Sequence, residues 1–278
     1  MDNSYLSIIV FIIITVVYCL FGKKQITLDS YLPDGQLKPN ATSLATLGIY
    51  FLVVISSQFA INSTYLINKC GGSAGNNIAI AALITFLPWI FIFGIVIATL
   101  IIFPGFKSPF ANVVGYFAIS RKANEILGNI LVDTDIDKAI TDEKISVEDK
   151  NKLQKSAQLI LKLCANKSVL INQITPENFI SAWNTMSSLM KDFGKSPEIL
   201  KQKEELLKLV VLKDNIGEMM WYIYTCVLLA SIISFQLATQ GCNKTVEQLK
   251  EGQAEWINKQ SKEKKKQELV NANPVKIT

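Results

Sequence analysis

The side chains that most often carry enzyme chemistry are scarce in this chain. It has no histidine, which is the commonest general base, the commonest metal ligand and the usual partner of a nucleophilic serine or cysteine. Its cysteines include no Cys-x-x-Cys pair, so a zinc site is not expected. Gly194-Lys195-Ser196 resembles the end of a phosphate-binding loop, but the loop's first glycine would fall at Leu189 and no strand precedes it. We predict no catalytic residue, no metal and no cofactor, and therefore no enzyme.

One acidic stretch has the spacing of a calcium ligand set. Asp133, Asp135 and Asp137 match the opening of an EF-hand loop. Lys138 stands where that loop requires glycine, and Lys144 stands where it requires its closing bidentate acid. A solvated acidic loop is therefore the simpler interpretation.

The lysine run 262–266 could bind nucleic acid or anionic lipid. Glu263 and Glu268 dilute its charge, and we interpret it as part of a solubilising tail. A short amphipathic helix is expected before it, with a frayed segment from Ser261 onward. No specific nucleic-acid partner is expected.

The elements that must position any site are dominated by apolar segments. Half of the 278 residues are hydrophobic and 18% are charged, whereas a soluble domain has roughly 25% charged residues. Four long blocks lack charge altogether: 3–22, 39–68, 70–106 and 219–243. About 20 apolar residues in a helix cross a hydrocarbon core of roughly 30 Å. The blocks show no polar stripe, so they predict an all-α, polytopic membrane protein with about four transmembrane helices and one helical soluble domain; three spans are the alternative.

The expected organisation follows the charge pattern. It comprises a transmembrane region, 1–106, with spans near 6–21, 44–61 and 78–103, then a helical soluble domain, 107–218, a fourth transmembrane helix, 219–240, and a lysine-rich tail, 241–278. Pro88 predicts a kink inside the third span, near Phe86 or Leu87. Thr175-Pro176-Glu177 and Ser196-Pro197-Glu198 each predict a helix start. The helix from Pro197 has no convincing stop before Trp221, so it is expected to continue into the fourth span.

Four spans place both termini on one face, and the first connection and the soluble domain on the other. The basic residues beside the membrane favour the domain side, which the positive-inside rule assigns to the cytoplasm: Lys23, Lys24, Lys38, Lys107, Arg121, Lys122, Lys208 and Lys213. Cys70 and Cys242 then share the opposite face, where either a disulfide or two unpaired thiols can be envisaged. Trp221, Tyr222 and Tyr224 predict an interfacial belt at the entry to the fourth span.

Nothing inside the predicted spans is ionisable, whereas ion and proton pathways usually contain such residues. Polar residues such as Gln58 and Thr85 more often bond one helix to another than line a pore. The pattern indicates an anchor. The rival interpretation is an oligomeric, viroporin-like channel.

Two segments carry a family resemblance. The third span with its exit, and the fourth span with the turn after it, resemble a transmembrane virion protein of nucleocytoplasmic large DNA viruses, of the phycodnavirus and mimivirus type. The matching residues are Pro88, Trp89, Phe103, Pro104, Gly105, Lys107, Pro109, Phe110, Asn112, Gly115, Tyr116, Gly241 and Cys242. Phe106 stands where tryptophan is expected.

The resemblance implies a structural role. The chain would be a minor capsid or inner-membrane protein that links the internal lipid bilayer to the icosahedral capsid, present in host membranes during assembly. Its partners would be the bilayer and other capsid or membrane proteins of the virion, with a homo-oligomer also open. We expect the exit segment to dock such partners, since two prolines would hold it extended and three phenylalanines supply contact area: Phe103, Pro104, Gly105, Phe106, Lys107, Pro109 and Phe110. A plain interfacial loop is the alternative.

Overall fold

The computed structural model describes residues 3–38, 41–70, 74–131, 167–187, 190, 196–242 and 246–272. Every regular element in these ranges is helical, and the only extended pairings are the isolated bridges Tyr31–Leu37 and Leu131–Met190. The predicted all-helical fold class is confirmed. The calcium-like acidic stretch, Cys164 and the pair Gly194-Lys195 lie outside the described residues.

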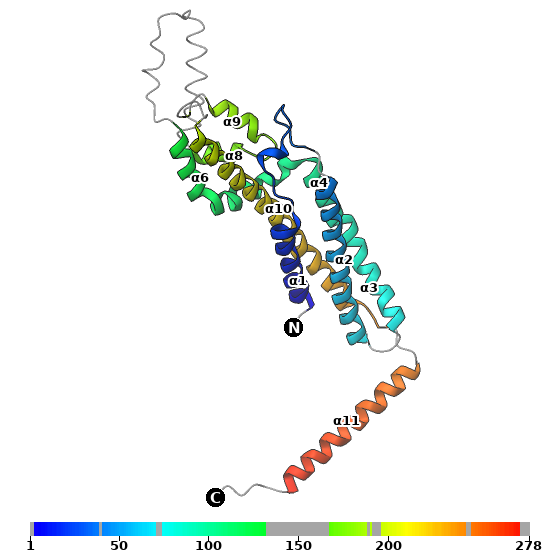
Figure 1. Cartoon of the computed structure of the whole chain (residues 1–278). Coiled ribbons are helices and arrows are strands. Elements are labelled where there is room, and N and C mark those ends of the chain that lie inside the picture. Colours follow the sequence, from blue (N-terminus) through cyan, green and yellow to red (C-terminus); the bar gives the residue numbers. More distant parts are fainter. Residues whose placement is uncertain are drawn as a thin grey trace, which may run out of the picture.

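Four long apolar helices run side by side and form the main body of the molecule (Figure 1). Each of them is long and apolar enough to cross a membrane. They are built from α1 (Asn3–Val17) with the π-helical turn η1 (Tyr18–Gly22), α2 (Ala41–Cys70), the composite of α3 (Ala74–Pro88), η3 (Trp89–Phe93) and α4 (Gly94–Ile102), and the second half of α10 (Pro197–Thr239).

Two details of these helices differ from the sequence-based expectation. The second helix does not stop near residue 61 but continues to Cys70. Just past residue 61, Asn62 Nδ2 donates to Thr85 Oγ1 at 3.0 Å on the neighbouring helix. Where a kink near Phe86 or Leu87 is predicted, α3 stays helical to Pro88, and a π-helical turn, Trp89–Phe93, directly follows the proline.

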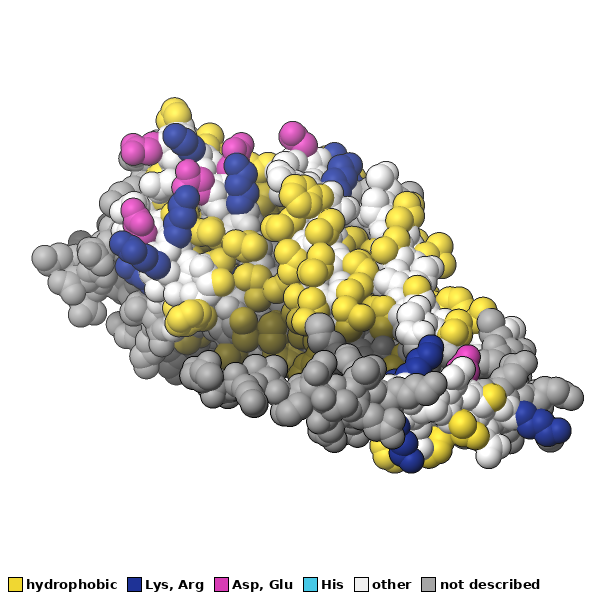
Figure 2. Space-filling model, turned by 90° about the horizontal axis from the view of Figure 1, so that it is seen from below, with side chains coloured by type: hydrophobic (Ala, Val, Ile, Leu, Met, Phe, Trp, Pro, Cys, Tyr) yellow, Lys and Arg dark blue, Asp and Glu magenta, His cyan; other side chains and the backbone are white. Residues whose placement is uncertain are grey.

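The four helices are apolar on their outer surface as well as in the core between them. Large aliphatic and aromatic side chains stand exposed on every one, among them Ile9, Ile13, Leu52, Leu83, Ile95, Val227 and Phe235. Figure 2 shows a broad field of hydrophobic side chains across the middle of the molecule, with the charged side chains gathered toward its ends. A water-facing helix would show a polar stripe there, so a lipid environment suits this surface.

Aromatic rings fill the centre of the four-helix body. Trp89 and Phe93 pack edge to face with ring centroids 5.3 Å apart, Phe93 and Tyr222 lie at 5.4 Å, and Tyr50 and Tyr222 at 5.7 Å. Phe11 contacts Trp89 at 5.6 Å. All five side chains are almost completely buried. The middle of the body is therefore a packed core.

Hydrogen bonds tie neighbouring helices within this body. Gln58 on α2 accepts from the hydroxyl of Ser7 on α1 and donates through Nε2 to the Ser7 carbonyl at 3.0 Å. Thr15 and Tyr50 hydroxyl groups lie 2.9 Å apart. The helix-to-helix role predicted for Gln58, like that of Thr85 described above, is confirmed.

A second core lies at one end of the body. It combines α6 (Tyr116–Ile130), α8 (Lys167–Gln173), α9 (Phe179–Ser187) and the first half of α10, with Leu127, Ile171, Phe179 and Leu206 fully or almost fully buried within it. No helix begins at Thr175 or Pro176: residues 176–178 form a turn, and α9 begins directly after it at Phe179. We call this second core and its helices the domain.

The first connection reaches the domain, as the four-span topology predicts. Tyr31 is buried in the domain core, and its hydroxyl donates to the carbonyl of Pro176 at 2.7 Å. Leu32 N and Gln36 O close the turn at 2.8 Å, with Gly35 at a positive φ of 85°.

Helix α10 is shared by both cores. Ser196 begins it, since its Oγ accepts a hydrogen bond from Ile199 N at 3.4 Å, and the helix then runs without interruption to Thr239. Leu206 and Val210 lie in the domain core, whereas Leu229 and Ile233 lie in the core of the four-helix body. The predicted continuous helix is confirmed.

Two glycines allow the segment after α4 to lie directly against α10. This segment comprises η4 (Pro104–Lys107), α5 (Ser108–Phe110) and η5 (Ala111–Gly115). A Cβ at Gly217 would come within 2.7 Å of Ala111 Cβ and 2.9 Å of the Lys107 carbonyl oxygen. A Cβ at Gly115 would come within 2.5 Å of the Lys213 carbonyl oxygen. The backbones therefore touch at these two positions.

Replacing either glycine by alanine should destabilise the chain. We expect Gly217→Ala and Gly115→Ala each to lower the free energy of unfolding by about 1–3 kcal/mol, because the new methyl group meets backbone atoms that cannot move aside. Gly94→Ala is the control: its Cβ would meet only the ring edge of Phe51 at 3.7 Å, so it should be neutral or slightly stabilising. Denaturant titration in detergent micelles measures all three. Equal effects at the three sites would contradict the close approach.

The opposite end of the body is closed by α2 and α10. Lys69 Nζ donates to the carbonyls of Leu237 and Ala238 at 2.9 and 2.6 Å, which satisfies acceptors that a helix end leaves open. Cys70 and Cys242 are joined by a disulfide, with Cα atoms 5.2 Å apart. These contacts place the ends of the second and fourth apolar helices together, far from the domain (Figure 1).

Beyond the disulfide, the tail is helical for longer than predicted. Helix α11 spans Val246–Ala272 and extends away from the four-helix body in Figure 1. The segment expected to fray from Ser261 stays helical as far as Ala272 because lysine, glutamate and glutamine are good helix formers and no glycine or proline interrupts them. Trp256 and Ile257 are exposed on α11.

Candidate functional site

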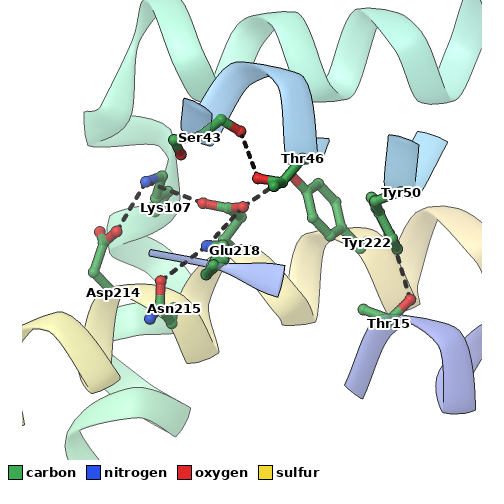
Figure 3. A network of polar contacts seen from close by, with 10 residues as sticks. Thr15, Ser43, Thr46, Tyr50, Lys107, Asp214, Asn215, Glu218 and Tyr222 are labelled. Carbon is green, nitrogen blue, oxygen red and sulfur yellow. Dashed lines mark hydrogen bonds and ion pairs between the residues drawn. The ribbon is translucent and has the colours of Figure 1, made fainter. Parts of the chain in front are cut away.

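Charged side chains from three separate parts of the chain meet where α10 passes from the domain into the four-helix body. Lys23 Nζ lies 2.8 Å from Glu218 Oε1 and donates to Asn215 Oδ1 at 2.8 Å. Lys107 Nζ lies 2.8 Å from Asp214 Oδ2 and 3.2 Å from Glu218 Oε2. We call Lys23, Lys107, Asp214 and Glu218 the junction cluster (Figure 3).

The helical turns next to each member of the cluster place its side chain close to the others. Lys23 directly follows η1, and its backbone N–H donates to the carbonyl of Tyr18 at 3.1 Å, which ends that helical turn. Lys107 ends the 3-10 turn that Pro104 begins. Asp214 and Glu218 are four residues apart on α10 and therefore share a face of the helix.

The cluster is largely shielded from water. Its four side chains are between 11% and 15% exposed, and it contains two positive and two negative groups. Burial alone would lower the pKa of Lys107, but the carboxylates of Asp214 and Glu218 outweigh burial and raise the pKa above its ordinary value. The lysine is therefore held charged. Buried charges require such pairing, because an unpaired one is costly to remove from water.

The tyrosine next to the cluster is not where the sequence-based prediction put it. Tyr222 does not belong to an interfacial belt: it is 1% exposed and its hydroxyl donates to Glu218 Oε1 at 2.9 Å. Successive residues of a helix point about 100° apart, so neighbours in sequence face different environments. Tyr224 is exposed and Trp221 is half-buried, so these two remain compatible with a belt position.

The residues of the segment predicted to dock partners fall into two groups, one packed against α10 and one exposed. It is helical rather than extended, which corrects the expected shape. Phe110 packs edge to face on Trp221 with centroids 5.2 Å apart, and the Phe106 carbonyl accepts from Trp221 Nε1 at 2.7 Å. Lys107 turns inward to the junction cluster. Phe103 and Phe106, 57% and 53% exposed, are the two rings left available for a partner.

A buried lysine lies one helical position before the cluster. Lys213 is 2% exposed, and its Nζ donates to the carbonyl of Ile171 at 2.8 Å and to Asn112 Oδ1 at 3.2 Å. It thereby joins α10 to α8 and η5 through neutral acceptors. Sequence analysis had counted Lys213 among the lysines beside the membrane, but its ammonium group faces the interior of the protein.

A cavity of about 280 Å³ opens beside the junction cluster. Its walls come from η1, the first connection, the start of α2, the end of α4 with η4, the turn before α9 and the middle of α10. A second cavity of about 250 Å³ lies on the domain side and shares Pro104, Pro176, Glu177 and Asp214 with the first.

The chemistry available here is electrostatic. Among the described residues no group of histidine, cysteine, aspartate or glutamate could hold a metal ion. The junction cluster offers paired charges, with the phenol of Tyr222 bonded to Glu218 beside it, and these groups can fix helices in register and can attract a charged ligand. Cys19 and Cys226 are the free thiols in the described part of the chain, and both lie within the apolar helices.

The cluster was missed by sequence analysis because its members are far apart in the chain. Lys107 and Asp214 are 107 positions apart, and Lys23 and Asn215 are 192 apart. A signal was nevertheless present. Lys23, Lys107 and Glu218 each stand directly beside an uncharged block, and the four-span topology puts all three at the same level on the same face.

Comparison with known protein families, with curated proteins and with solved structures gives no match.

Proposed function

We propose that this chain is a non-enzymatic membrane anchor that holds a helical domain rigidly against one face of a lipid bilayer. The observation that carries the proposal is the single helix α10, which belongs to both cores and is locked at their boundary by the junction cluster. Because one uninterrupted helix joins the two parts, force applied to the domain reaches the bilayer-facing body directly.

The orientation follows from charge and from the disulfide. Lys24, Lys38, Arg121 and Lys122 stand on the domain side and support its cytoplasmic placement by the positive-inside rule. The disulfide Cys70–Cys242 lies at the opposite end, and disulfides persist in oxidising compartments. Both features favour the same arrangement.

The resemblance of the third and fourth apolar helices to a transmembrane virion protein extends the proposal. In that role the anchor links the internal membrane of a virion to the capsid around it, with the exposed rings of Phe103 and Phe106 as the contact for a capsid protein. The rival channel function is less well supported, because Trp89, Phe93 and Tyr222 fill the centre of the body. Flux of small ions from liposomes that contain the chain would reverse this preference.

Replacing the two exposed rings tests the docking role. We expect Phe103→Ser with Phe106→Ser to reduce cross-links between the chain and capsid proteins at least about tenfold, as hot-spot aromatic residues usually dominate an interface. Resistance to carbonate extraction from membranes should stay unchanged. Phe110 is kept, because it packs on Trp221 and its loss would disturb the fold.

The control for this experiment is Phe117→Ser, which removes another highly exposed ring, on α6, outside the docking segment. Cross-linking should stay at the wild-type level in this variant. If the double variant loses membrane insertion while its capsid cross-links persist per inserted molecule, Phe103 and Phe106 are membrane contacts and the docking role is wrong.

A further inference from the structure

The cavity beside the junction cluster has two unlike walls. One wall is basic and contains Lys24 and Lys38 from the first connection. The other wall is apolar and contains Leu47 of α2 with Leu100 and Ile101 of α4. A ligand that fits both walls carries a negative group at one end and hydrocarbon at the other.

The charges around the cavity do not cancel. Four lysines and three acids line it, which leaves one net positive charge. Lys23 and Lys107 are held by Glu218 and Asp214 within the junction cluster. Lys24 and Lys38 form no ion pair with any described residue, although Lys38 Nζ donates to the Asp29 carbonyl at 2.7 Å. The third acid, Glu177, offsets one of these two lysines, so one net positive charge is available to an anion.

The start of α2 adds backbone donors at the same place. Ser43, in the first turn of this 30-residue helix, lines the cavity and lies close to Lys107 in Figure 3. The first N–H groups of a helix have no partner within it, and the helix dipole favours negative charge there. The helix start therefore adds to the attraction of Lys24 and Lys38 for an anion, and it would not by itself make an anion site.

The cavity also lies at the right depth for a lipid headgroup. Its apolar wall continues into the exposed apolar surface of the four-helix body, where Leu44 on α2 and Ile102 on α4 are uncovered. Its basic wall belongs to the first connection, which begins directly after η1. An ammonium pair at this boundary is level with the phosphates of a surrounding bilayer, where basic pockets between helices bind anionic headgroups.

We propose that this cavity binds the phosphate group of an anionic glycerophospholipid. Lys24 and Lys38 contact the phosphate oxygens, the first turn of α2 donates to them, and an acyl chain lies along Leu47, Leu100 and Ile101. Free inorganic phosphate shares the headgroup's chemistry but lacks the hydrocarbon. The inference rests on the proposed membrane insertion and adds a specific lipid site to it.

Native mass spectrometry of the full chain in detergent tests the site. The probes are phosphatidylglycerol, phosphatidylcholine and inorganic phosphate. We expect a tight first phosphatidylglycerol, and the double variant Lys24→Gln with Lys38→Gln should weaken it about 30-fold, since each lysine contributes about 1 kcal/mol at a membrane surface. Phosphatidylcholine binding should be weaker and unaffected. The matched control, Lys201→Gln with Lys208→Gln, removes two exposed lysines of α10 that do not line the cavity and should leave the affinity unchanged.

Three results would overturn the assignment. Equal weakening in the variant and in the control would show general surface attraction. Equal affinity for phosphatidylglycerol and phosphatidylcholine would remove the preference for an anionic headgroup. Binding of inorganic phosphate as tight as that of the lipid would identify the ligand as free phosphate. A chain that stays monodisperse in buffer without detergent would instead refute membrane insertion, so the two failures are distinguishable.

Discussion

Glu218→Gln is expected to lower the free energy of unfolding by about 3–5 kcal/mol, the largest effect of any single substitution considered. Glutamine has nearly the same shape but no charge, so Lys23 loses the only ion-pair partner that it has among the described residues and keeps its hydrogen bond to the amide oxygen of Asn215. Leaving one member of a buried pair uncompensated costs about that much. Tyr222 should also loosen, because its hydroxyl bonds to the same carboxylate. Unfolding of the full chain in lipid nanodiscs, followed by tryptophan fluorescence, measures the change.

Two further variants separate the buried pair from ordinary surface charge. Glu205→Gln makes the same chemical change at a solvent-exposed pair, where Glu205 lies 3.8 Å from Lys122, and it should cost less than about 0.5 kcal/mol. Lys23→Met combined with Glu218→Gln removes both charges, while Lys107 keeps Asp214, and should recover most of the lost stability. Similar losses for Glu218→Gln and Glu205→Gln would show that the junction cluster does not hold the two cores together.

The parts of the fold that could be predicted are those that depend on residues close together in the sequence. An uncharged block of about 20 residues specifies a potential span by itself, because helix length and hydrocarbon thickness decide the matter. The start of α10 is equally local, since Ser196, Pro197 and Glu198 form the cap, the first helical residue and the acidic first turn. The continuity of α10 through Gly217 follows from the absence of any stop signal.

The parts that could not be predicted depend on contacts between distant residues. The second helix continues past residue 61 to Cys70, and its Asn62 finds a hydrogen-bond acceptor in Thr85 on another helix. Tyr222 faces inward because its hydroxyl bonds to Glu218 and its ring packs against Phe93. Helix geometry alone indicates only that Trp221 and Tyr224 point in other directions. A local reading also gives no reason for Gly217, whose role is visible only once Ala111 lies against it.

These contacts give α10 a distinct role at each of its levels. Its first half completes the domain core, its middle carries the acids of the junction cluster, and its second half completes the four-helix body. The end is fastened to α2 by Lys69 and by the disulfide. A helix fixed at its middle and at its end can transmit position along its whole length, which suits the proposed role as a membrane anchor.

Removing the disulfide should release the end of α10 that lies farthest from the domain. We expect Cys70→Ala with Cys242→Ala to lower the free energy of unfolding by about 2–4 kcal/mol, within the range typical of disulfides, because the bond closes a loop between residues 172 positions apart. This loss of stability should be smaller than loop-closure entropy gives for an unfolded chain of that length, because helices kept in a bilayer retain much of their order when the bundle opens. Lys69 keeps its bonds to the last carbonyls of α10, so the separation should be local.

Hydrogen exchange of the full chain in nanodiscs locates the effect. Amides near Leu237 and at the end of α2 should exchange faster in the double variant, while those around Glu218 stay protected. Cys19→Ala is the control, because this half-buried thiol forms no disulfide. In sealed vesicles, a reductant that cannot cross the membrane should break the bond only from the face opposite the domain. Reduction from the same face on which a protease digests the domain would refute the four-span topology. In that topology one apolar helix, and so one crossing, separates the domain from each cysteine, which places both cysteines on the opposite face.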